Sequence, residues 1–367
     1  QKTAYEIYQC DWSSDVCSSD LAGLQCGGHF QTGARAHGLH QVQGTTNVPP
    51  NRHNAVMNWF EHFDLHKVTL KGRPVRYRVT SQAEWQAHPE RPVLVLLHGF
   101  PQTHVLWHRV AQQLRGHYRL VMPDLRGYGE SSCELGEPDH ANYSKRAMAQ
   151  EVIDLLDTLG VQDFYLCGHD RGGRVAHRLA LDHGARVRKM CVLDIAPTLD
   201  MYAATNFEFA QAYYHWFHLT QPTPVPEVMI GGDPENYLKL KMKGWGSNGG
   251  TFFEAEAMAE YLRCFCDPTL NEKGWRATVH AKAEDYRASA TIDLEHDRAS
   301  RAKGEKIPCD LLVMCGDRGV VHRQFDSLKL WQAQCLGQVT YRAVPSGHYI
   351  PEELPEVTAQ ALIEFMR

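Results

Sequence analysis

The sequence predicts an α/β fold, with a mostly parallel central sheet flanked by helices and an inserted helical cap. Three observations support this prediction. Short apolar runs alternate with helix-like stretches, as in chains that form parallel sheets. The run from Val93 to Leu97 is apolar throughout, which is typical of a strand covered on both faces. The interval 199–296 contains no comparable strand, and it is too long for a loop.

The first elements expected are two antiparallel strands at an edge of the sheet. Val68-Thr69-Leu70 and the alternating stretch Val75 to Val79 flank the turn Lys71-Gly72-Arg73-Pro74. The sheet then continues through short apolar runs. These runs are Val93–Leu97, Tyr118–Met122, Phe164–Cys167, Met190–Leu193 and Leu311–Met314. Val339 to Val344 is the expected last strand, and Thr358 to Met366 is the expected closing helix.

The same patterns divide the chain into segments. Residues 1–55 repeat a Ser-Ser-Asp unit and lack strand or helix periodicity, so we expect a disordered or artefactual extension. The α/β core is expected at 56–198 and 297–367, and the helical cap at 199–296. A cap inserted there would cover the edge of the sheet where α/β proteins bind their ligands.

Composition argues against several classes of protein. The 367 residues are 43% hydrophobic and 22% charged, which is ordinary for a globular protein with a large core. The net charge of −5 gives no general basic field for nucleic acid or an anionic membrane, and no apolar run is long enough to span a membrane. The 11 cysteines lie mostly in apolar runs, and Cys264 and Cys266 lack a second pair at zinc spacing. We expect a cytoplasmic protein without a metal, a membrane anchor or a nucleic-acid partner.

The most informative segment is Gly168-His169-Asp170-Arg171-Gly172-Gly173. It follows an apolar run and precedes a helix-like stretch that begins at about Gly173. A Gly-x-Asp-x-Gly turn in this place has the form of a nucleophile elbow with aspartate in place of serine, and glycines leave room for so crowded a turn. The alternative is that Asp170 caps the helix, which is a common role for aspartate. The neighbouring motifs favour the elbow.

Two further loops supply partners for such a nucleophile. The loop His98-Gly99-Phe100-Pro101 follows a buried run, and the backbone N–H groups of Phe100 and Arg171 are the expected oxyanion hole. The loop that contains His348 follows the last strand, which makes His348 the expected catalytic base among 21 histidines.

The acid that orients His348 is left open between two residues. Asp194 follows the strand after the elbow, and Asp317 follows the next strand. Enzymes with such an elbow often carry the acid three residues after a strand-ending glycine, but that position is Gly319 here. Asp194 is therefore favoured over Asp317.

These motifs resemble those of the haloacetate (fluoroacetate) dehalogenases, which have the α/β-hydrolase fold. The resemblance extends from about Trp59 to the C-terminus. The segment Gly168 to Arg174 is similar to that family's nucleophile segment, and Leu193 to Thr198 to its triad-acid segment. The resemblance implies that Asp170 attacks the substrate and that no metal or organic cofactor takes part.

The resemblance also implies roles for residues that bind substrate. Arg171 and Arg174 stand in the positions that hold the substrate carboxylate, and arginine suits this role because its guanidinium binds carboxylates in a bidentate manner. His215, Trp216 and Tyr286 correspond to the residues that bind the departing halide. An alternative for His215 and Trp216 is simple aromatic packing within the cap. The stretch 271–281 is longer than the family's pattern, which affects the geometry before Tyr286.

The implied reaction converts a short 2-halocarboxylate to the 2-hydroxy acid and halide through an aspartyl ester, in a homodimeric enzyme. An epoxide hydrolase or a haloalkane dehalogenase would use the same Asp–His pair, and Tyr213, Tyr214 and Tyr286 are candidates for an epoxide hydrolase's tyrosines. Both of those families usually carry tryptophan where this chain has Arg171, which favours an acid as substrate. A third alternative is a small-molecule receptor that keeps the fold but lacks catalysis.

Overall fold

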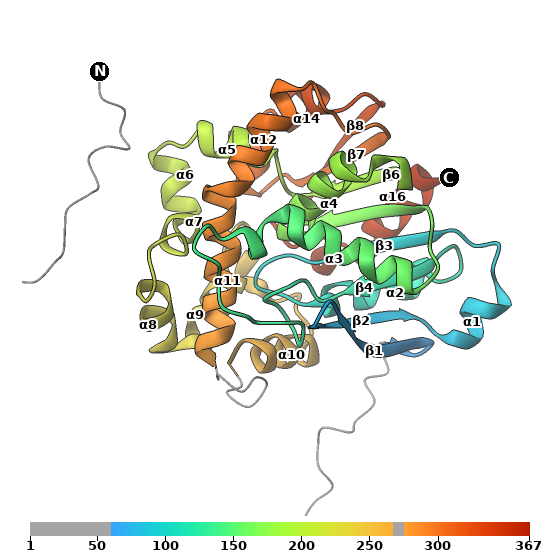
Figure 1. Cartoon of the computed structure of the whole chain (residues 1–367), viewed down its shortest axis with the longest axis horizontal. Coiled ribbons are helices and arrows are strands. Elements are labelled where there is room, and N and C mark those ends of the chain that lie inside the picture. Colours follow the sequence, from blue (N-terminus) through green and yellow to red (C-terminus); the bar gives the residue numbers. More distant parts are fainter. Residues whose placement is uncertain (1–59, 267–274) are drawn as a thin grey trace, which may run out of the picture. The chain divides into compact units, whose positions relative to one another are not determined.

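The computed structural model describes residues 60–266 and 275–367, and its central feature is an eight-stranded sheet (Figure 1). The strands are β1 Phe63–Leu70, β2 Arg73–Thr80, β3 Val93–Leu97, β4 Arg119–Pro123, β5 Phe164–His169, β6 Val187–Leu193, β7 Asp310–Gly316 and β8 Val339–Val344. Their order is β1-β2-β4-β3-β5-β6-β7-β8. β2 is antiparallel to β1 and to β4, whereas the other neighbours are parallel. The predicted fold class is confirmed.

The direction of the chain along the sheet decides which helices cover each face. The core helices are α1 Gln82–Ala87, α2 His108–Leu114, α3 Lys145–Thr158, α4 Arg171–Asp182, α13 Val320–Gln324, α14 Ser327–Gln334, α15 Ile350–Glu353 and α16 Pro355–Met366. The step from β3 to β4 runs toward β1, whereas the steps from β4 to β5 and from β5 to β6 run the other way. Right-handed crossovers therefore place α2 on one face and α3 and α4 on the other. Accordingly, α2 packs with α16, and α3 packs with α4.

The reversal of direction lies between β3 and β5, and it positions the candidate site. These strands are hydrogen-bonded neighbours, although one connection leaves toward β4 and the other toward β6. Loops that follow such strands diverge, and α/β proteins bind ligands where they do so. The loop at 98–101 follows β3, and Asp170 follows β5 directly. Sequence position and sheet order thus bring these two segments together.

Between β6 and β7 the described chain forms helices without a strand. These helices are α5 Thr198–Ala203, α6 Phe207–Ala212, α7 Tyr214–His218, α8 Val225–Gly231, α9 Pro234–Met242, α10 Ala255–Cys266, α11 Trp275–Ala290 and α12 Ile292–Ala302. α12 crosses the expected boundary at 296, so the helical segment continues to Ala302. α11 contacts α8 as well as the short 3-10 helix Ala141–Tyr143 that precedes α3 (Figure 1).

Several expectations fall partly or wholly outside the described ranges. These are the extension at 1–55, the first residues of the expected core at 56–59, and the first part of the long connection at 271–281. Within the described ranges each cysteine is free, and no helix has the length and apolar character needed to cross a membrane.

A buried carboxyl group on α15 joins the cap to the loop that follows β3. Glu352, on α15, is fully buried, and its Oε1 accepts hydrogen bonds from Gln102 Nε2 at 3.1 Å and from the Tyr261 hydroxyl. Gln102 follows β3, and Tyr261 belongs to α10. Burial raises the pKa of Glu352 to about 8, because the charged form loses its hydration. The folded protein therefore holds a proton that the unfolded chain releases at a much lower pH.

We expect this proton to make stability depend on pH. Between the ordinary pKa of a glutamate and about 8, the native state binds one more proton than the unfolded state, so the free energy of unfolding falls as pH rises. The contribution is about 1.4 kcal/mol per pH unit at most. In Glu352→Gln, which keeps an acceptor for Gln102 and Tyr261, this contribution should be absent. Urea unfolding of both proteins from pH 5 to 8 measures it, and a stability difference that stays constant across this range would contradict the expectation.

Candidate active site

The elbow predicted at Asp170 forms a sharp, strained turn. Asp170 has φ 48° and ψ −115°, a conformation that costs a residue with a Cβ free energy, and α4 begins at the next residue. The helix thus begins two residues before the expected Gly173. The Asp170 side chain makes no capping hydrogen bond to α4, so the capping alternative is wrong. Glycines make the turn possible, because a Cβ on Gly168 would lie 2.5 Å from the Gly172 carbonyl oxygen.

The Asp170 carboxylate is buried and contacts two of the predicted partners. The backbone N–H of Phe100 donates to Oδ1 at 2.9 Å, and His348 Nε2 lies 3.8 Å from Oδ2. The second predicted oxyanion donor, the Arg171 N–H, has no hydrogen bond to this carboxylate in the described structure. Burial disfavours the charged form, but the surrounding imidazole and guanidinium groups outweigh it, so the pKa of Asp170 lies below its ordinary value. The carboxylate is therefore ionised at neutral pH.

The structure places Asp194, rather than Asp317, beside His348. His348 Nδ1 lies 2.6 Å from Asp194 Oδ2, and both residues are buried. The backbone N–H of Gly316 donates to the other carboxylate oxygen of Asp194 at 3.2 Å. The bond to Asp194 outweighs burial and raises the pKa of His348. Asp317 is half exposed, and its carboxylate contacts Arg318 instead.

Two residues that sequence reasoning missed fix the position of His348. His169 Nε2 donates to the His348 carbonyl oxygen at 2.8 Å, and the two rings lie 4.7 Å apart. The His348 N–H donates to the Trp245 carbonyl oxygen at 3.1 Å, and the Trp245 ring lies 5.2 Å from that of His348. Trp245 has a φ of 57° and stands between Gly244 and Gly246. That glycine-rich turn was the available signal, but it did not reveal which residue Trp245 contacts.

Arg171 is fully buried, and one side of its guanidinium is bonded. Nε donates to Asp285 Oδ2 and Nη2 to Asp285 Oδ1, each at 2.8 Å, and Nη2 also donates to the Ser289 hydroxyl. Cζ lies 4.1 Å from the centre of the Tyr286 ring. Nη1 has no hydrogen-bond partner among the residues that the structure describes. A buried, unpaired nitrogen of this kind is available to a ligand.

Arg174 is buried too, but its partners are neutral. Nη1 donates to the Thr198 hydroxyl at 2.9 Å and to the Ala196 carbonyl oxygen at 3.2 Å, and Cζ lies 4.6 Å from the centre of the Trp216 ring. Nε is unpaired, and no carboxylate of residues 60–266 or 275–367 forms an ion pair with Arg174. Burial, followed by the charge of Arg171, lowers its pKa. A buried cation without a carboxylate partner favours an anionic ligand.

The predicted halide-binding residues lie around this carboxylate and these cations. The His215 ring lies 5.8 Å from that of Phe100 and 5.6 Å from that of Tyr286. His215 Nδ1 and the Tyr286 hydroxyl have no hydrogen-bond partner in the described part of the chain. Burial, together with the charge of Asp170, raises the pKa of Tyr286 well above its ordinary value. Tyr286 therefore keeps its proton and can act as a donor.

The surroundings of Trp216 fit both of its expected roles, aromatic packing within the cap and a place at the site. Its ring packs against those of Tyr202 at 4.8 Å and Phe209 at 5.5 Å, as expected of aromatic cap packing. The Arg174 guanidinium nevertheless lies over the same ring, which brings Trp216 to the border of the site. Packing and a role in the site are compatible for this residue.

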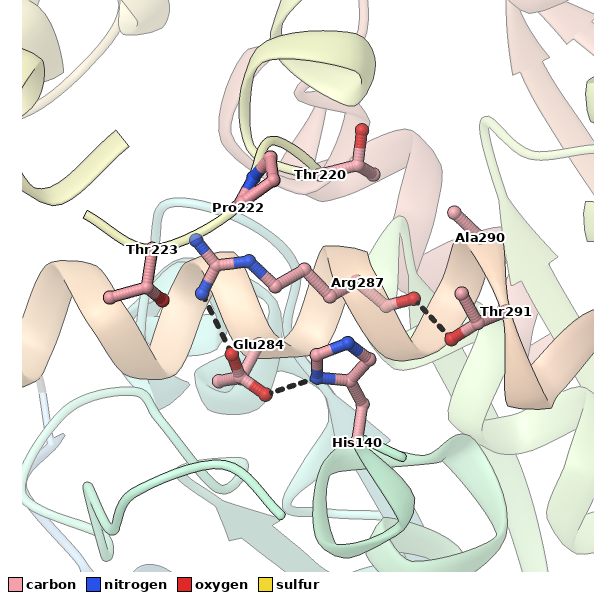
Figure 2. Close-up of a pocket in the computed structure, with 8 residues that line it drawn as sticks. All are labelled: His140, Thr220, Pro222, Thr223, Glu284, Arg287, Ala290 and Thr291. Atoms are coloured by element: carbon pink, nitrogen blue, oxygen red, sulfur yellow. Dashed lines mark hydrogen bonds and ion pairs between the residues drawn. The ribbon is translucent and has the colours of Figure 1, made fainter. Parts of the chain in front are cut away.

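An open cavity of about 290 Å³ lies apart from these residues. Figure 2 shows that Glu284 lies between His140 and Arg287, and Thr291 follows the end of α11. His140 Nδ1 is 2.6 Å from Glu284 Oε2, and Arg287 Nη1 donates to Glu284 Oε1 at 2.7 Å. Helix periodicity turns Arg287 to the side of α11 opposite Asp285, and Glu284 lies about 100° from Asp285 around the helix axis. This cavity therefore has a different lining from the site at Asp170.

The described residues also contain no cluster of three or more His, Cys, Asp or Glu side chains arranged to hold a metal ion. The site at Asp170 thus consists of a carboxylate, a histidine with its acid, two guanidinium groups and aromatic side chains. These groups can supply nucleophilic displacement, general base catalysis and anion binding.

Comparison with known proteins identifies relatives over most of the chain. A family model described as the alpha/beta hydrolase fold matches residues 92–355. Fluoroacetate dehalogenase of a Burkholderia species is 43% identical over 275 residues, 75% of this chain and 87% of that protein. Soluble epoxide hydrolase of Corynebacterium sp. strain C12 is 29% identical over 279 residues, 74% of this chain and 89% of that protein. A solved structure from Nostoc sp. PCC 7120, described as a candidate α/β hydrolase, is 44% identical with a TM-score of 0.76, covering 84% of this chain and 99% of that chain.

The packing of the elbow predicts that Gly172→Ala destabilises the protein. An added Cβ would lie 2.4 Å from the carbonyl oxygens of Leu97 and His98, so β3 or α4 must shift. Overpacking of this kind costs about 1–3 kcal/mol, which exceeds the gain in helix propensity from glycine to alanine. Gly116→Ala is a matched control, because nothing lies within 4 Å of its added Cβ. Urea unfolding should show a large loss for Gly172→Ala alone, and equal stabilities would contradict this account of the elbow.

Proposed function

The chain belongs to the α/β-hydrolase fold family, and we propose that it is a hydrolytic dehalogenase of short 2-halocarboxylates such as haloacetate. The observation that carries the proposal is Arg174, a buried cation with neutral partners next to the elbow that presents Asp170. A carboxylate nucleophile repels an anionic substrate unless positive charge nearby compensates. Arg174 supplies most of that charge, and Arg171 adds its unpaired Nη1 as a donor. The similarity to a fluoroacetate dehalogenase supports the same substrate class.

In the first step, Asp170 Oδ2 attacks the carbon that bears the halogen. A C–O bond forms, the C–halogen bond breaks, and the halide leaves with its electron pair. Oδ1 keeps its hydrogen bond from Phe100, which supports the choice of Oδ2 as the attacking atom. The two guanidinium groups would hold the substrate carboxylate so that the halogen points away from Asp170.

The departing halide gains negative charge in this step, so donors that strengthen their bonds with it lower the barrier. The unpaired Tyr286 hydroxyl and the unpaired ring nitrogen of His215 are suited to this role, together with Trp216. Fluoride is a poor leaving group and depends most on such donors.

The second step hydrolyses the ester that joins Asp170 to the product. His348, oriented by Asp194, takes a proton from water, and the hydroxide attacks the carbonyl carbon of Asp170. The Phe100 N–H stabilises the oxyanion that forms on Oδ1. The ester C–O bond then breaks, and His348 returns its proton to the 2-hydroxy acid as it leaves.

An epoxide hydrolase is the second candidate, because a relative carries that name and two of the tyrosines considered for that activity have buried, unpaired hydroxyls. These belong to Tyr213 and Tyr286, whereas Tyr214 is about half exposed. A neutral epoxide would leave Arg174 without an ion-pair partner among the described residues, which disfavours this candidate. A haloalkane would do the same.

We expect halide release from haloacetates and no diol formation from an epoxide. Fluoroacetate, chloroacetate, bromoacetate and styrene oxide should be assayed side by side, with ion chromatography for halide and chromatography for diol. Halide release from at least one haloacetate supports the proposal, and its magnitude across the series gives the halide preference. Diol formation with no halide release would replace the proposal with the epoxide hydrolase alternative. Ligand binding with neither product would support the receptor alternative.

A second expectation concerns the order of the two steps. His348→Gln should still form the ester but lose its base for hydrolysis, so Asp170 should gain the mass of one carboxymethyl group after incubation with chloroacetate. Peptide mass spectrometry locates the adduct. A folded His348→Gln protein without an adduct would count against an aspartyl ester.

Replacement of the two candidate acids provides a matched comparison. Asp194→Asn removes the group bonded to His348 and should lower kcat by a factor of roughly 10³ or more, as loss of an orienting acid does in related triads. Asp317→Asn removes an exposed carboxylate and should leave kcat within about twofold. Equal losses in the two variants would contradict the assignment of Asp194.

A further inference from the structure

We infer that Asp285 is a positioning residue of this site, which holds the Arg171 guanidinium away from Asp170 and leaves one of its nitrogens free for the substrate. The inference rests on the function proposed above and assigns a role to a residue next to the predicted Tyr286. The hydrogen bonds of the Arg171 guanidinium involve Nε and Nη2, whereas Nη1 has no partner among the described residues.

Asp285 binds Arg171 in a bidentate manner inside the protein. Its side chain is fully buried, and its two oxygens accept from Nε and Nη2 at 2.8 Å each. Its backbone carbonyl oxygen also accepts from Nη2 at 2.8 Å. These bonds fix the plane of the guanidinium, so Nη1 has a defined direction although it has no partner in the described structure.

Such a restraint is needed because Asp170 and Arg171 are adjacent in sequence and oppositely charged. In a buried setting, a guanidinium and a carboxylate attract strongly, and a direct ion pair would occupy both the nucleophile and the substrate-binding cation. The structure shows no such pair: Asp170 has His348 as its ion-pair contact among the described residues, at 3.8 Å. Competition from Asp285 for the guanidinium gives a physical reason.

Further bonds keep Asp285 ionised and in place. The Tyr128 hydroxyl donates to Oδ2 at 2.7 Å, and the Lys145 ammonium binds Oδ1. Burial opposes ionisation, but the charges of Arg171 and Lys145 outweigh it and hold the pKa of Asp285 below its ordinary value. Lys145 also lies 3.4 Å from Asp293.

The two guanidinium groups therefore have different tasks. The charge of Arg171 is balanced by Asp285, so this residue mainly contributes a hydrogen bond of fixed direction. The charge of Arg174 is not balanced by a carboxylate ion pair in the described chain, so it mainly contributes attraction for the substrate anion. Loss of the Asp285 charge should affect turnover more than substrate capture.

Asp285→Asn tests this role with chloroacetate as substrate. The quantities measured are kcat, KM and the acid limb, which is the pH at which kcat/KM falls on the acidic side of its profile. We expect kcat to fall by about ten- to hundredfold, with a smaller change in KM, because Arg171 turns toward Asp170 and pairs with the nucleophile. This pairing stabilises the Asp170 carboxylate, so the acid limb should move to lower pH. His348, His169 and Arg174 also act on the pKa of Asp170, and they are unchanged in the variant.

Asp293→Asn is the matched control, because it removes a carboxylate that pairs with Lys145 and reaches Arg171 only through the Ser289 hydroxyl. It should leave kcat within about threefold and the acid limb in place. Tyr128→Phe removes one bond to Asp285 and should shift kcat and the acid limb in the direction of Asp285→Asn, by a smaller amount. This variant tests the inference if Asp285→Asn does not fold.

The outcomes separate the inference from the proposed function. If the unaltered protein releases no halide from any haloacetate, the proposed function fails, and the inference fails with it. If halide is released but Asp285→Asn keeps its kcat and acid limb, or Asp293→Asn loses as much, the inference alone is overturned. A lower kcat with an unshifted acid limb would indicate a structural role for Asp285 and would also overturn it.

Discussion

The structure of the site depends on keeping two buried guanidinium groups close to a buried carboxylate without letting them neutralise it. Each cation has other partners: Arg171 is bonded to Asp285, and Arg174 to a hydroxyl and a carbonyl oxygen. Asp170 in turn accepts from the Phe100 N–H. The two cations therefore form no direct ion pair with Asp170. A negatively charged ligand can bind them and gain the electrostatic attraction that Asp170 does not use.

The fold supplies the positions that this arrangement requires. The change of direction between β3 and β5 brings the loop with Phe100 next to the turn at Asp170, and parallel strands deliver Asp194 and His348 to the same edge. The strained conformation of Asp170 persists because β3, β5 and α4 pack too tightly for the turn to relax, as the close contacts around Gly168 and Gly172 indicate. The strain at Asp170 thus depends on the packing of these three elements.

Most of the core could be predicted from the sequence, because its strands are buried on both faces and appear as apolar runs. The elbow and His348 could be predicted because a turn motif and strand order place them. The choice between Asp194 and Asp317 needed the structure, since both follow a strand and only a distance separates them. Asp285 and Trp245 were missed because their roles arise from contacts between cap and core. Such contacts leave no periodic pattern in the sequence.

Helix α11 presents Asp285 and Tyr286 to the site from consecutive positions. In the reaction proposed, one residue governs the acid end of the substrate and the next faces the leaving group. One helix therefore links the preference for the acid group of the substrate to the preference for its halogen, although the chemistry of the reaction would allow the two to vary independently. Evolution or engineering that retunes this enzyme for a larger halogen by moving α11 would also disturb recognition of the acid. New leaving-group preferences should accordingly arise through side-chain replacement at fixed backbone, or together with compensating changes around Lys145 and Tyr128.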